Sequence, residues 1–388
     1  MLFRSKELSD KNKDIHLFVP TFDIPSCLSQ IQQCLEKGWT GLGDKTVEFE
    51  QAFCERFNHP NAHFLNSATA GLHLAVKILK QFHGWQDGDE IITTPFTFVS
   101  TNHAILYENL QPIFADIDDY LCLDPECIAQ CITPRTRAIM FVGIGGNTGQ
   151  WQEVVNLCRQ RKLAIILDAA HMTGTRLDGK NPALSADASI YSFQAVKNLP
   201  TADAGMVCFA EKEHDIAARK LAWLGIDKDT YTRTQSDNSY RWYYEVDDIG
   251  YKYHGNAIMA AIGLSQLDCL ESDNDYRRTL AKNYRSRLAM IEGITLIPTA
   301  PNCMSSQHLF QILVDQRDEV MLELNKRRIY PGVHYRDNTE YAMYRYGQGQ
   351  CPRAHTLSRK VMSLPLHLRL VEADIDRVTN ALAEIVNY

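Results

Sequence analysis

The chain is predicted to be an α/β protein with a mostly parallel central sheet flanked by helices and a smaller C-terminal α+β domain. Over about the first 250 of its 388 residues, short apolar runs alternate with helical patterns. Such alternation is typical of a parallel sheet with helices on both faces. A long charged helical stretch and a mixture of short strands and helices follow. Because domains usually hold about 100–200 residues, we divide the chain into a large domain, 1–250, and linking helices with a small domain, 251–388.

Each element is predicted from its apolar periodicity, which alternates in strands and recurs every third or fourth residue in helices. The strands of the large domain are Glu90–Thr94, Pro112–Ala115, Ala138–Gly143, Leu163–Asp168, Ala188–Phe193 and Gly205–Ala210. Its helices are Ser67–Phe82, Asn102–Glu108, Gln152–Arg161 and Asp215–Leu224. Further on we expect a helix at Ala257–Leu270, a second helix to about Ile291, strands Ser306–Val314 and Val333–Tyr335, and helices Val320–Lys326 and Glu372–Val386.

Residues 226–248 interrupt this pattern with a polar and aromatic stretch that has no clear period. We interpret the stretch as an excursion that contacts a substrate or a second subunit. The alternative is a loop with local packing, and both interpretations stay open.

The composition excludes several classes of protein. The net charge is −7 and no basic cluster occurs, which argues against a nucleic-acid partner. No run of about 18 apolar residues is present, so no membrane span is expected, and the charged N-terminus lacks the apolar core of a signal peptide. The eleven cysteines are scattered, and the group from Cys122 to Cys131 lacks the fourth ligand of a zinc site. We therefore expect reduced thiols, no metal and a cytoplasmic location.

A lysine and an aspartate are the candidate catalytic residues. Lys197 follows the predicted strand Ala188–Phe193 and lies among apolar and small residues, where desolvation lowers an amine pKa and leaves a nucleophile for an aldehyde. Asp168 ends another strand, where a buried carboxylate needs a cationic partner such as a protonated pyridine nitrogen. This pair is what pyridoxal phosphate (PLP) chemistry requires. The alternatives are a solvated surface lysine and an aspartate that caps the next helix.

Other candidate ligands lie at helix starts and strand ends. Residues 66–69 precede an amphipathic helix, whose first N–H groups attract phosphate, and Ser192 adds a hydroxyl. The ring of Phe98 can stack on a flat heteroaromatic ring, and His171 follows Asp168 closely enough to reach a ring hydroxyl. Most of these residues also have a purely structural interpretation. Residues 66–69 can be an ordinary helix N-cap, Phe98 can be a core aromatic residue, and His171 can be a neighbour whose hydrogen bonds are satisfied within the fold. Because ligands collect at the carboxyl ends of parallel strands, we expect these residues to share one crevice.

The segment Gly143–Gly149 follows a strand and looks like a dinucleotide-binding loop. The sixth position of G-x-G-x-x-G is Thr148, and the segment lies outside the first βαβ unit of the chain. No P-loop and no G-x-S-x-G elbow occurs either. We therefore do not expect NAD.

Taken together, these segments resemble the DegT/DnrJ/EryC1/StrS family of PLP-dependent nucleotide-sugar aminotransferases. The matching blocks cover almost the whole chain in the order of the family. In one-letter code they are GWTGLG at 38–43, NSATA at 66–70, PFTF at 95–98, DAAH at 168–171, SFQAVKN at 192–198, GYKYH at 250–254, AAIGLSQL at 260–267, GVHY at 332–335 and SLPL at 363–366.

The resemblance implies a fold-type I PLP-dependent transferase that works as a homodimer with each active site at the subunit interface. It implies that Lys197 binds the cofactor aldehyde and that Asp168 pairs with the pyridine nitrogen. His171 would then lie near the ring oxygen, and Phe98 would stack on the ring.

The resemblance also implies a phosphate site made of Ala68, Thr69 and Ser192. The chain departs from the family pattern here, because Ala68 replaces the usual glycine. Lys252 stands where the family places an asparagine donated by the second subunit, and a lysine can still neutralise phosphate. His254 replaces a common arginine.

The implied activity moves an amino group from L-glutamate, which leaves 2-oxoglutarate, to a keto sugar. Nucleotide-linked 4-keto-6-deoxyhexoses are the commonest acceptors in the family, in pathways to surface polysaccharide, lipopolysaccharide, O-antigen or glycosides. A 3-keto sugar and an unlinked acidic keto sugar are alternatives, since Lys252 can also meet a carboxylate. A PLP-dependent sugar dehydratase on the same scaffold would carry histidine at position 197. A non-catalytic relative would have lost Asp168, Lys197 or Ser192, and all three are present.

Overall fold

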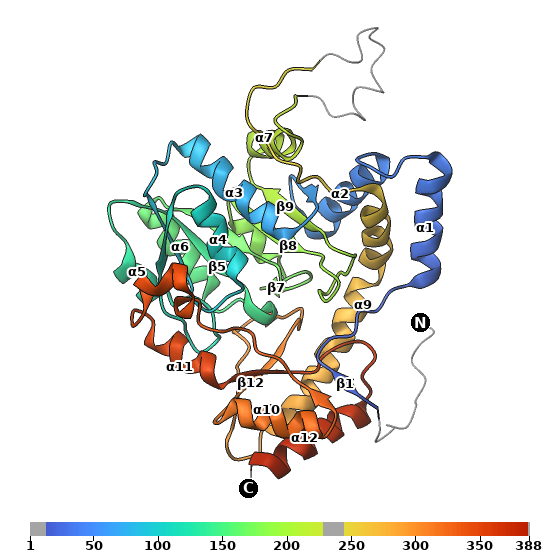
Figure 1. Ribbon diagram of the computed structural model, residues 1–388, viewed down its shortest axis with the longest axis vertical. Helices are drawn as coiled ribbons and strands as arrows, with labels where there is room; N and C mark the ends of the chain where they lie inside the picture. Colours follow the sequence, from blue (N-terminus) through green and yellow to red (C-terminus); the bar gives the residue numbers. More distant parts are fainter. Residues whose placement is uncertain (1–12, 228–243, 387–388) are drawn as a thin grey trace.

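The computed structural model describes residues 13–227 and 244–386, and its centre is a seven-stranded sheet (Figure 1). The strands, in their order across the sheet, are β2 (His63–Leu65), β9 (Gly205–Phe209), β8 (Ala188–Ser192), β6 (Ala164–Asp168), β5 (Thr136–Val142), β3 (Glu90–Thr93) and β4 (Gln111–Phe114). The last five pair in parallel, whereas β9 runs antiparallel to both of its neighbours.

The predicted α/β class with a mostly parallel sheet is confirmed. All six strands predicted for the large domain are present, and their ends differ from the prediction by at most two residues. They could be recognised because β3, β5, β6, β8 and β9 are buried along almost their whole length, so each reads as a short apolar run. The short edge strand β2 was not predicted, because three residues show no period.

Helices cover both faces of this sheet. One apolar cluster joins it to α3 (Ala68–His83), α4 (Val99–Tyr107) and α7 (Lys212–Ala222). A second cluster joins its other face to α2 (Asp44–Phe57), α5 (Pro125–Cys131), α6 (Trp151–Arg161) and α9 (Ala257–Leu288). Helix α4 begins three residues before the predicted start. The sequence did not predict this first turn, because it contains the β-branched Val99 and Thr101, which have low helix propensity.

Helix α9 corrects one prediction. The sequence was divided into two helices near residue 270, where the composition turns from apolar to charged. The structure has one helix of 32 residues, which no proline interrupts. Figure 1 shows α9 running from α1 (Ile24–Lys37) and α2 to the C-terminal part of the chain, and it packs on α1, α2 and α12 (Glu372–Val386). The composition turns from apolar to charged because the first part of this single helix packs on α1 and α2 and its later part packs on the C-terminal part of the chain.

The C-terminal part is built on a three-stranded antiparallel sheet with the order β10 (Ile294–Leu296), β12 (Phe310–Val314) and β14 (Val361–Leu364). Helices α10 (Arg317–Lys326) and α12 share its apolar cluster. Two small pairings complete the set, β1 (Ile15–His16) with β13 (Ile329–Tyr330) and β7 (Arg176–Leu177) with β11 (Cys303–Met304). The other helices in the part of the chain that the structure describes are α11 (Pro352–Lys360), η1 (Ile144–Gly146), η2 (Pro182–Ser185), η3 (Asn338–Glu340) and η4 (Ala342–Gly347).

The predicted strand Val333–Tyr335 is wrong. Only an isolated bridge from Gly332 to Ser363 forms there, and the side chains of His334 and Tyr335 contact other parts of the chain. The strand predicted to begin at Ser306 begins at Phe310. The division of the chain at residue 250 stays a prediction.

Three further expectations concern the cysteines, membrane spans and the stretch 226–248. The eleven cysteines are all free in the structure. In residues 13–227 and 244–386, no helix has the length and apolarity needed to cross a membrane. Most of the predicted excursion 226–248 lies outside the described residues, at 228–243.

Candidate active site

The candidate catalytic residues meet at the carboxyl ends of two neighbouring parallel strands. Asp168 is the last residue of β6, and β8, which pairs with β6, ends at Ser192. Lys197 lies on the loop that joins β8 to the antiparallel β9, and backbone hydrogen bonds from Phe193 to Ala204 and from Thr201 to Phe193 close this loop. The hairpin therefore returns the lysine to the strand end at which Asp168 lies.

Asp168 is a buried carboxylate that is 5% exposed. Its Oδ2 accepts a hydrogen bond of 2.7 Å from the Thr101 hydroxyl, and its Oδ1 accepts one of 3.1 Å from the Ala170 N–H. No described residue forms an ion pair with it at 4.0 Å or less. Burial raises the pKa of this carboxyl, although the two hydrogen bonds and the Lys197 charge act in the opposite direction. The alternative of a helix cap is excluded, since a turn follows.

Lys197 has the properties of a nucleophilic amine. Its side chain is half-buried, and its Nζ lies 3.5 Å from Nε2 of His308. Burial lowers the pKa of the amine to about 8, while the negative charge of Asp168 opposes that shift. A larger share of this amine is therefore neutral near physiological pH than in an ordinary surface lysine.

His171 is neutral, and its hydrogen bonds fix its tautomer. Its Nδ1 accepts a hydrogen bond of 3.1 Å from the N–H of Gly145, so the proton is on Nε2, 3.1 Å from the hydroxyl of Tyr335. Burial, followed by the Lys197 charge, lowers its pKa well below the ordinary value. The Gly143–Gly149 segment thus contributes a donor to this histidine.

The predicted phosphate ligands come together at the start of α3. Ser67 is the N-cap and accepts from the N–H of Ala70, which leaves Ala68 and Thr69 as the first helical residues. Gly205 pairs with Ser192 across the β8–β9 ladder. A Cβ on Gly205 would lie 2.5 Å from the nitrogen of Ala68, so only glycine allows this approach. Ser192 is thereby brought to the helix N-terminus, where an anion is favoured.

These residues fit PLP. A buried carboxylate without an ion-pair partner among the described residues matches a protonated pyridine nitrogen, and the N-terminus of α3 matches a phosphate. Lys197 supplies an amine of lowered pKa for the aldehyde. The fit follows from the chemistry of this set of groups.

Phe98 and Lys252 lie at the edges of this arrangement. Phe98 is 57% exposed, and its ring centroid lies 6.2 Å from that of Tyr335, which bonds to His171. The backbone carbonyl of Lys252 accepts from the Asn66 side chain, beside the start of α3, but its amine lies over the Trp223 ring, 3.4 Å from the centroid. The roles predicted for both residues stay predictions.

Sequence reasoning missed Thr101, Tyr335 and His308. Thr101 lies one helical turn after PFTF, and a hydroxyl at that spacing was the available signal. Tyr335 and His308 were assigned to strands, and nothing in their local sequence indicates that they meet His171 and Lys197.

Replacing Thr101 with valine should lower kcat/KM by roughly 10- to 100-fold, the effect of one lost hydrogen bond to a charged group. Valine keeps the volume of this fully buried side chain but cannot donate to Asp168. The pKa of the carboxyl then rises further and its ionised form becomes scarcer. Steady-state kinetics test this, with the exposed Thr356→Val as the control. Equal activity in the two variants would show that Thr101 does not support Asp168.

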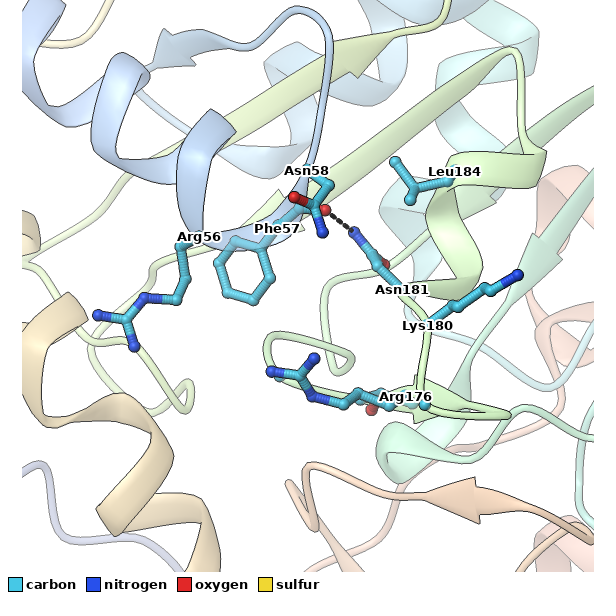
Figure 2. Close-up of a pocket in the computed structure, with 10 residues that line it drawn as sticks. Arg56, Phe57, Asn58, Arg176, Lys180, Asn181 and Leu184 are labelled. Atoms are coloured by element: carbon cyan, nitrogen blue, oxygen red, sulfur yellow. Dashed lines mark hydrogen bonds between the residues drawn. The ribbon is translucent and has the colours of Figure 1, made fainter.

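A separate cavity of about 270 Å³ lies between the end of α2 and the β7 hairpin. Figure 2 shows Arg56, Arg176 and Lys180 around it and the hydrogen bond from Asn181 to the backbone of Phe57. None of the predicted site residues lines it. Its basic side chains are exposed or half-buried, so it offers no activated group, and we place the active site at the strand ends.

Comparisons with known proteins give matches over nearly the whole chain. The model of the DegT/DnrJ/EryC1/StrS aminotransferase family matches residues 24–383. SpsC, a spore coat polysaccharide biosynthesis protein of Bacillus subtilis, is 31% identical over 371 residues, which cover 92% of this chain and 94% of SpsC.

Solved structures are similar over almost the whole chain. PseC of Helicobacter pylori, an aminotransferase involved in the biosynthesis of pseudoaminic acid, has a TM-score of 0.88 at 26% identity, covering 97% of this chain and 100% of PseC. Spr1654 of Streptococcus pneumoniae in its PMP form has a TM-score of 0.88 at 25% identity, covering 95% and 98%. The predicted fold-type I architecture is therefore confirmed.

Proposed function

This chain belongs to the DegT/DnrJ/EryC1/StrS aminotransferase family and is a PLP-dependent sugar aminotransferase, and we propose that it moves an amino group from L-glutamate to a nucleotide-linked 4-keto-6-deoxyhexose. The observation that carries the catalytic assignment is the meeting of Lys197, an amine of lowered pKa, with the buried carboxylate of Asp168. The amino donor and the sugar acceptor follow from the family resemblance.

Each residue has a proposed task. When bound, PLP supplies an electron sink that stabilises negative charge at the carbon from which a proton is removed. Asp168 keeps a pyridine nitrogen protonated by pairing with it. Lys197 would hold the cofactor through its amine, and its Nζ would carry the proton that is moved, for which a pKa of about 8 suits neutral pH.

The remaining residues bind and orient. Ala68 and Thr69 offer backbone N–H groups and Ser192 a hydroxyl to the phosphate, at the positive end of the α3 dipole. His171, whose Nε2 carries a proton, reaches the ring oxygen through its own N–H or through Tyr335. Phe98, whose aromatic side chain is exposed, would stack on the ring.

We also propose a cytoplasmic homodimer. The large apolar side chains left exposed at Val246 and Ile249 are 56% and 86% accessible in the single chain, and a partner subunit would cover them. In such a dimer Lys252 would approach the phosphate of the partner's site. Eleven unpaired cysteines suit a reducing compartment.

A substrate panel tests the proposal. The protein is incubated with [¹⁵N]glutamate and UDP-, dTDP- or GDP-linked keto sugars or unlinked acidic keto sugars, and products are read by mass spectrometry. We expect ¹⁵N in a nucleotide-linked 4-amino sugar and 2-oxoglutarate in equal amount, with Lys197→Ala as the inactive control. If ¹⁵N appeared only in an unlinked sugar or in a 3-amino sugar, the proposed acceptor would be wrong. A sugar product that had lost oxygen without gaining ¹⁵N would indicate a dehydratase.

A further inference from the structure

His308 is the hydrogen-bonding partner that the structure gives to the Lys197 amine. Its Nε2 lies 3.5 Å from Nζ of Lys197. The imidazole is 4% exposed and packs between aromatic neighbours, with ring centroids 4.3 Å from His171 and 5.5 Å from Phe18. A ring so enclosed has one orientation, and its chemistry depends on which nitrogen carries the proton.

The neighbouring Asn198 decides this tautomer. Its Nδ2 donates two hydrogen bonds of 2.7 Å, to Oδ1 of Asn274 and to the backbone carbonyl of Ser306. A carbonyl can only accept, so the amide cannot be flipped, and its Oδ1 faces Nδ1 of His308 at 3.0 Å. Nδ1 of His308 must therefore be the protonated nitrogen, and the lone pair of Nε2 points to Lys197.

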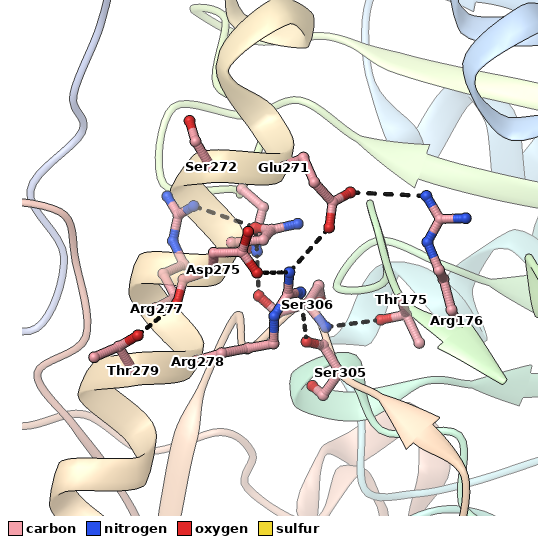
Figure 3. A network of polar contacts seen from close by, with 12 residues as sticks. Thr175, Arg176, Glu271, Ser272, Asp275, Arg277, Arg278, Thr279, Ser305 and Ser306 are labelled. Atoms are coloured by element: carbon pink, nitrogen blue, oxygen red, sulfur yellow. Dashed lines mark hydrogen bonds and ion pairs between the residues drawn. The ribbon is translucent and has the colours of Figure 1, made fainter. Parts of the chain in front are cut away.

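Asn274 is held just as firmly. Its Nδ2 donates to the carbonyl of Thr173 at 3.0 Å, and its Oδ1 also accepts from the buried guanidinium of Arg277. Figure 3 shows Arg277 on helix α9 and Ser306 on the loop before β12 in this polar network. Gly174 has a positive φ of 92°, and a Cβ there would lie 2.4 Å from Nδ2 of Asn274, so the loop can approach only as glycine.

We propose that His308 is a positioning residue that orients the neutral Lys197 amine, through a tautomer fixed by Asn198 and Asn274. When one amine N–H donates to Nε2, the nitrogen lone pair is directed away from His308. This inference rests on the proposed role of Lys197 as the cofactor-binding lysine.

The role is orientation and not proton storage. Burial, reinforced by the charges of His171 and Lys197, lowers the pKa of His308 well below its ordinary value, so the ring stays neutral near pH 7. The other titratable groups around Lys197 are Asp168 on β6, His334, and the two residues Arg277 and His367 that line the same small cavity. Burial lowers the pKa of His334 to about 4, that of His367 to about 3 and that of Arg277 to about 10. Of these groups, only the amine itself titrates near pH 8.

The test is the rate at which PLP attaches covalently to the apoprotein, followed by absorbance over a pH range that brackets 8. Only the neutral amine attacks, so the wild-type rate should rise with pH through about 8 and then level off. N-α-acetyl-lysine as the amine corrects for the titration of PLP itself. His308→Phe keeps an aromatic ring but removes the hydrogen-bond acceptor Nε2. Because that acceptor favours the ammonium form of Lys197, its loss should not raise the pKa of the amine.

In His308→Phe we expect the midpoint at or below pH 8 and a plateau about 10-fold lower, because the neutral amine is no longer oriented. His308→Gln, which restores an acceptor, should return the plateau to within about 3-fold, and the exposed His83→Phe should match the wild type. An unchanged plateau overturns the inference. So does a midpoint that moves toward 10.5, which would show only that water had entered. If the wild type itself attaches no PLP, the proposed role of Lys197 fails instead.

A second measurement needs no cofactor. In ¹⁵N-histidine-labelled apoprotein, the NMR signals lost in His308→Phe belong to His308. They should show a protonated Nδ1 and an unprotonated Nε2 at pH 7. The opposite tautomer, or an imidazolium, would overturn the inference.

Discussion

Lys197→Ala should abolish the absorbance of covalently bound PLP and lower turnover by at least about 10⁴-fold, because one residue supplies both the attachment point and the proton carrier. Alanine cannot replace either function, and no other described lysine forms a hydrogen bond or ion pair with Asp168 or His308. Fold and oligomeric state should be unchanged, since the half-buried Lys197 side chain makes a single long hydrogen bond to His308.

The absorbance spectrum and single-turnover kinetics with glutamate check this expectation. Lys212→Ala, an exposed lysine in the first turn of α7, is the matched control and should behave as the wild type. Retention of both the absorbance and turnover in Lys197→Ala would remove the catalytic assignment.

Asp168→Asn should lower kcat/KM by about 10²–10³-fold, the scale of losing one preorganised electrostatic contact. The amide oxygen can still accept from the Ala170 N–H, and the amide N–H can donate to the Thr101 hydroxyl oxygen, so the local geometry survives, but an amide cannot keep a pyridine nitrogen protonated.

The same substitution should leave the apoprotein as stable as the wild type or more stable. In the folded chain the pKa of Asp168 is raised above its unfolded value of 3.8, so its ionisation disfavours folding as the pH rises through that interval. Asparagine removes this term. Thermal unfolding near pH 7 and kinetics measured together therefore separate catalysis from folding, with the exposed Asp178→Asn as the control. A large loss of apoprotein stability would show that Asp168 is structural.

The sequence was informative where one local run determines the structure. Strands β6 and β8 are buried apolar runs, and the residues that end them, Asp168 and Ser192, could be placed at one sheet edge from that fact alone. The start of α3 could also be predicted from local sequence, because Ser67 caps the helix that it precedes.

The features of the fold and the site that the sequence did not predict depend on contacts between segments that are distant in the chain. His308 reaches Lys197 across 111 positions and Tyr335 reaches His171 across 164, so no window of sequence contains either pair. Helix α9 was divided because its polar half looks exposed until the C-terminal sheet is in place. Val333–Tyr335 has the apolar and aromatic character of a strand, yet the hydrogen bond of Tyr335 to His171 fixes it elsewhere.

The central claim is that Lys197 is the residue that binds PLP opposite Asp168. The most direct measurement is borohydride reduction of the PLP-loaded protein, followed by proteolysis and mass spectrometry of the labelled peptide. The account predicts a reduced pyridoxyl group on Lys197 in the peptide that spans β8 and its loop, and no such label on this peptide in Lys197→Ala. A label on another lysine, such as Lys252, or on none would contradict it.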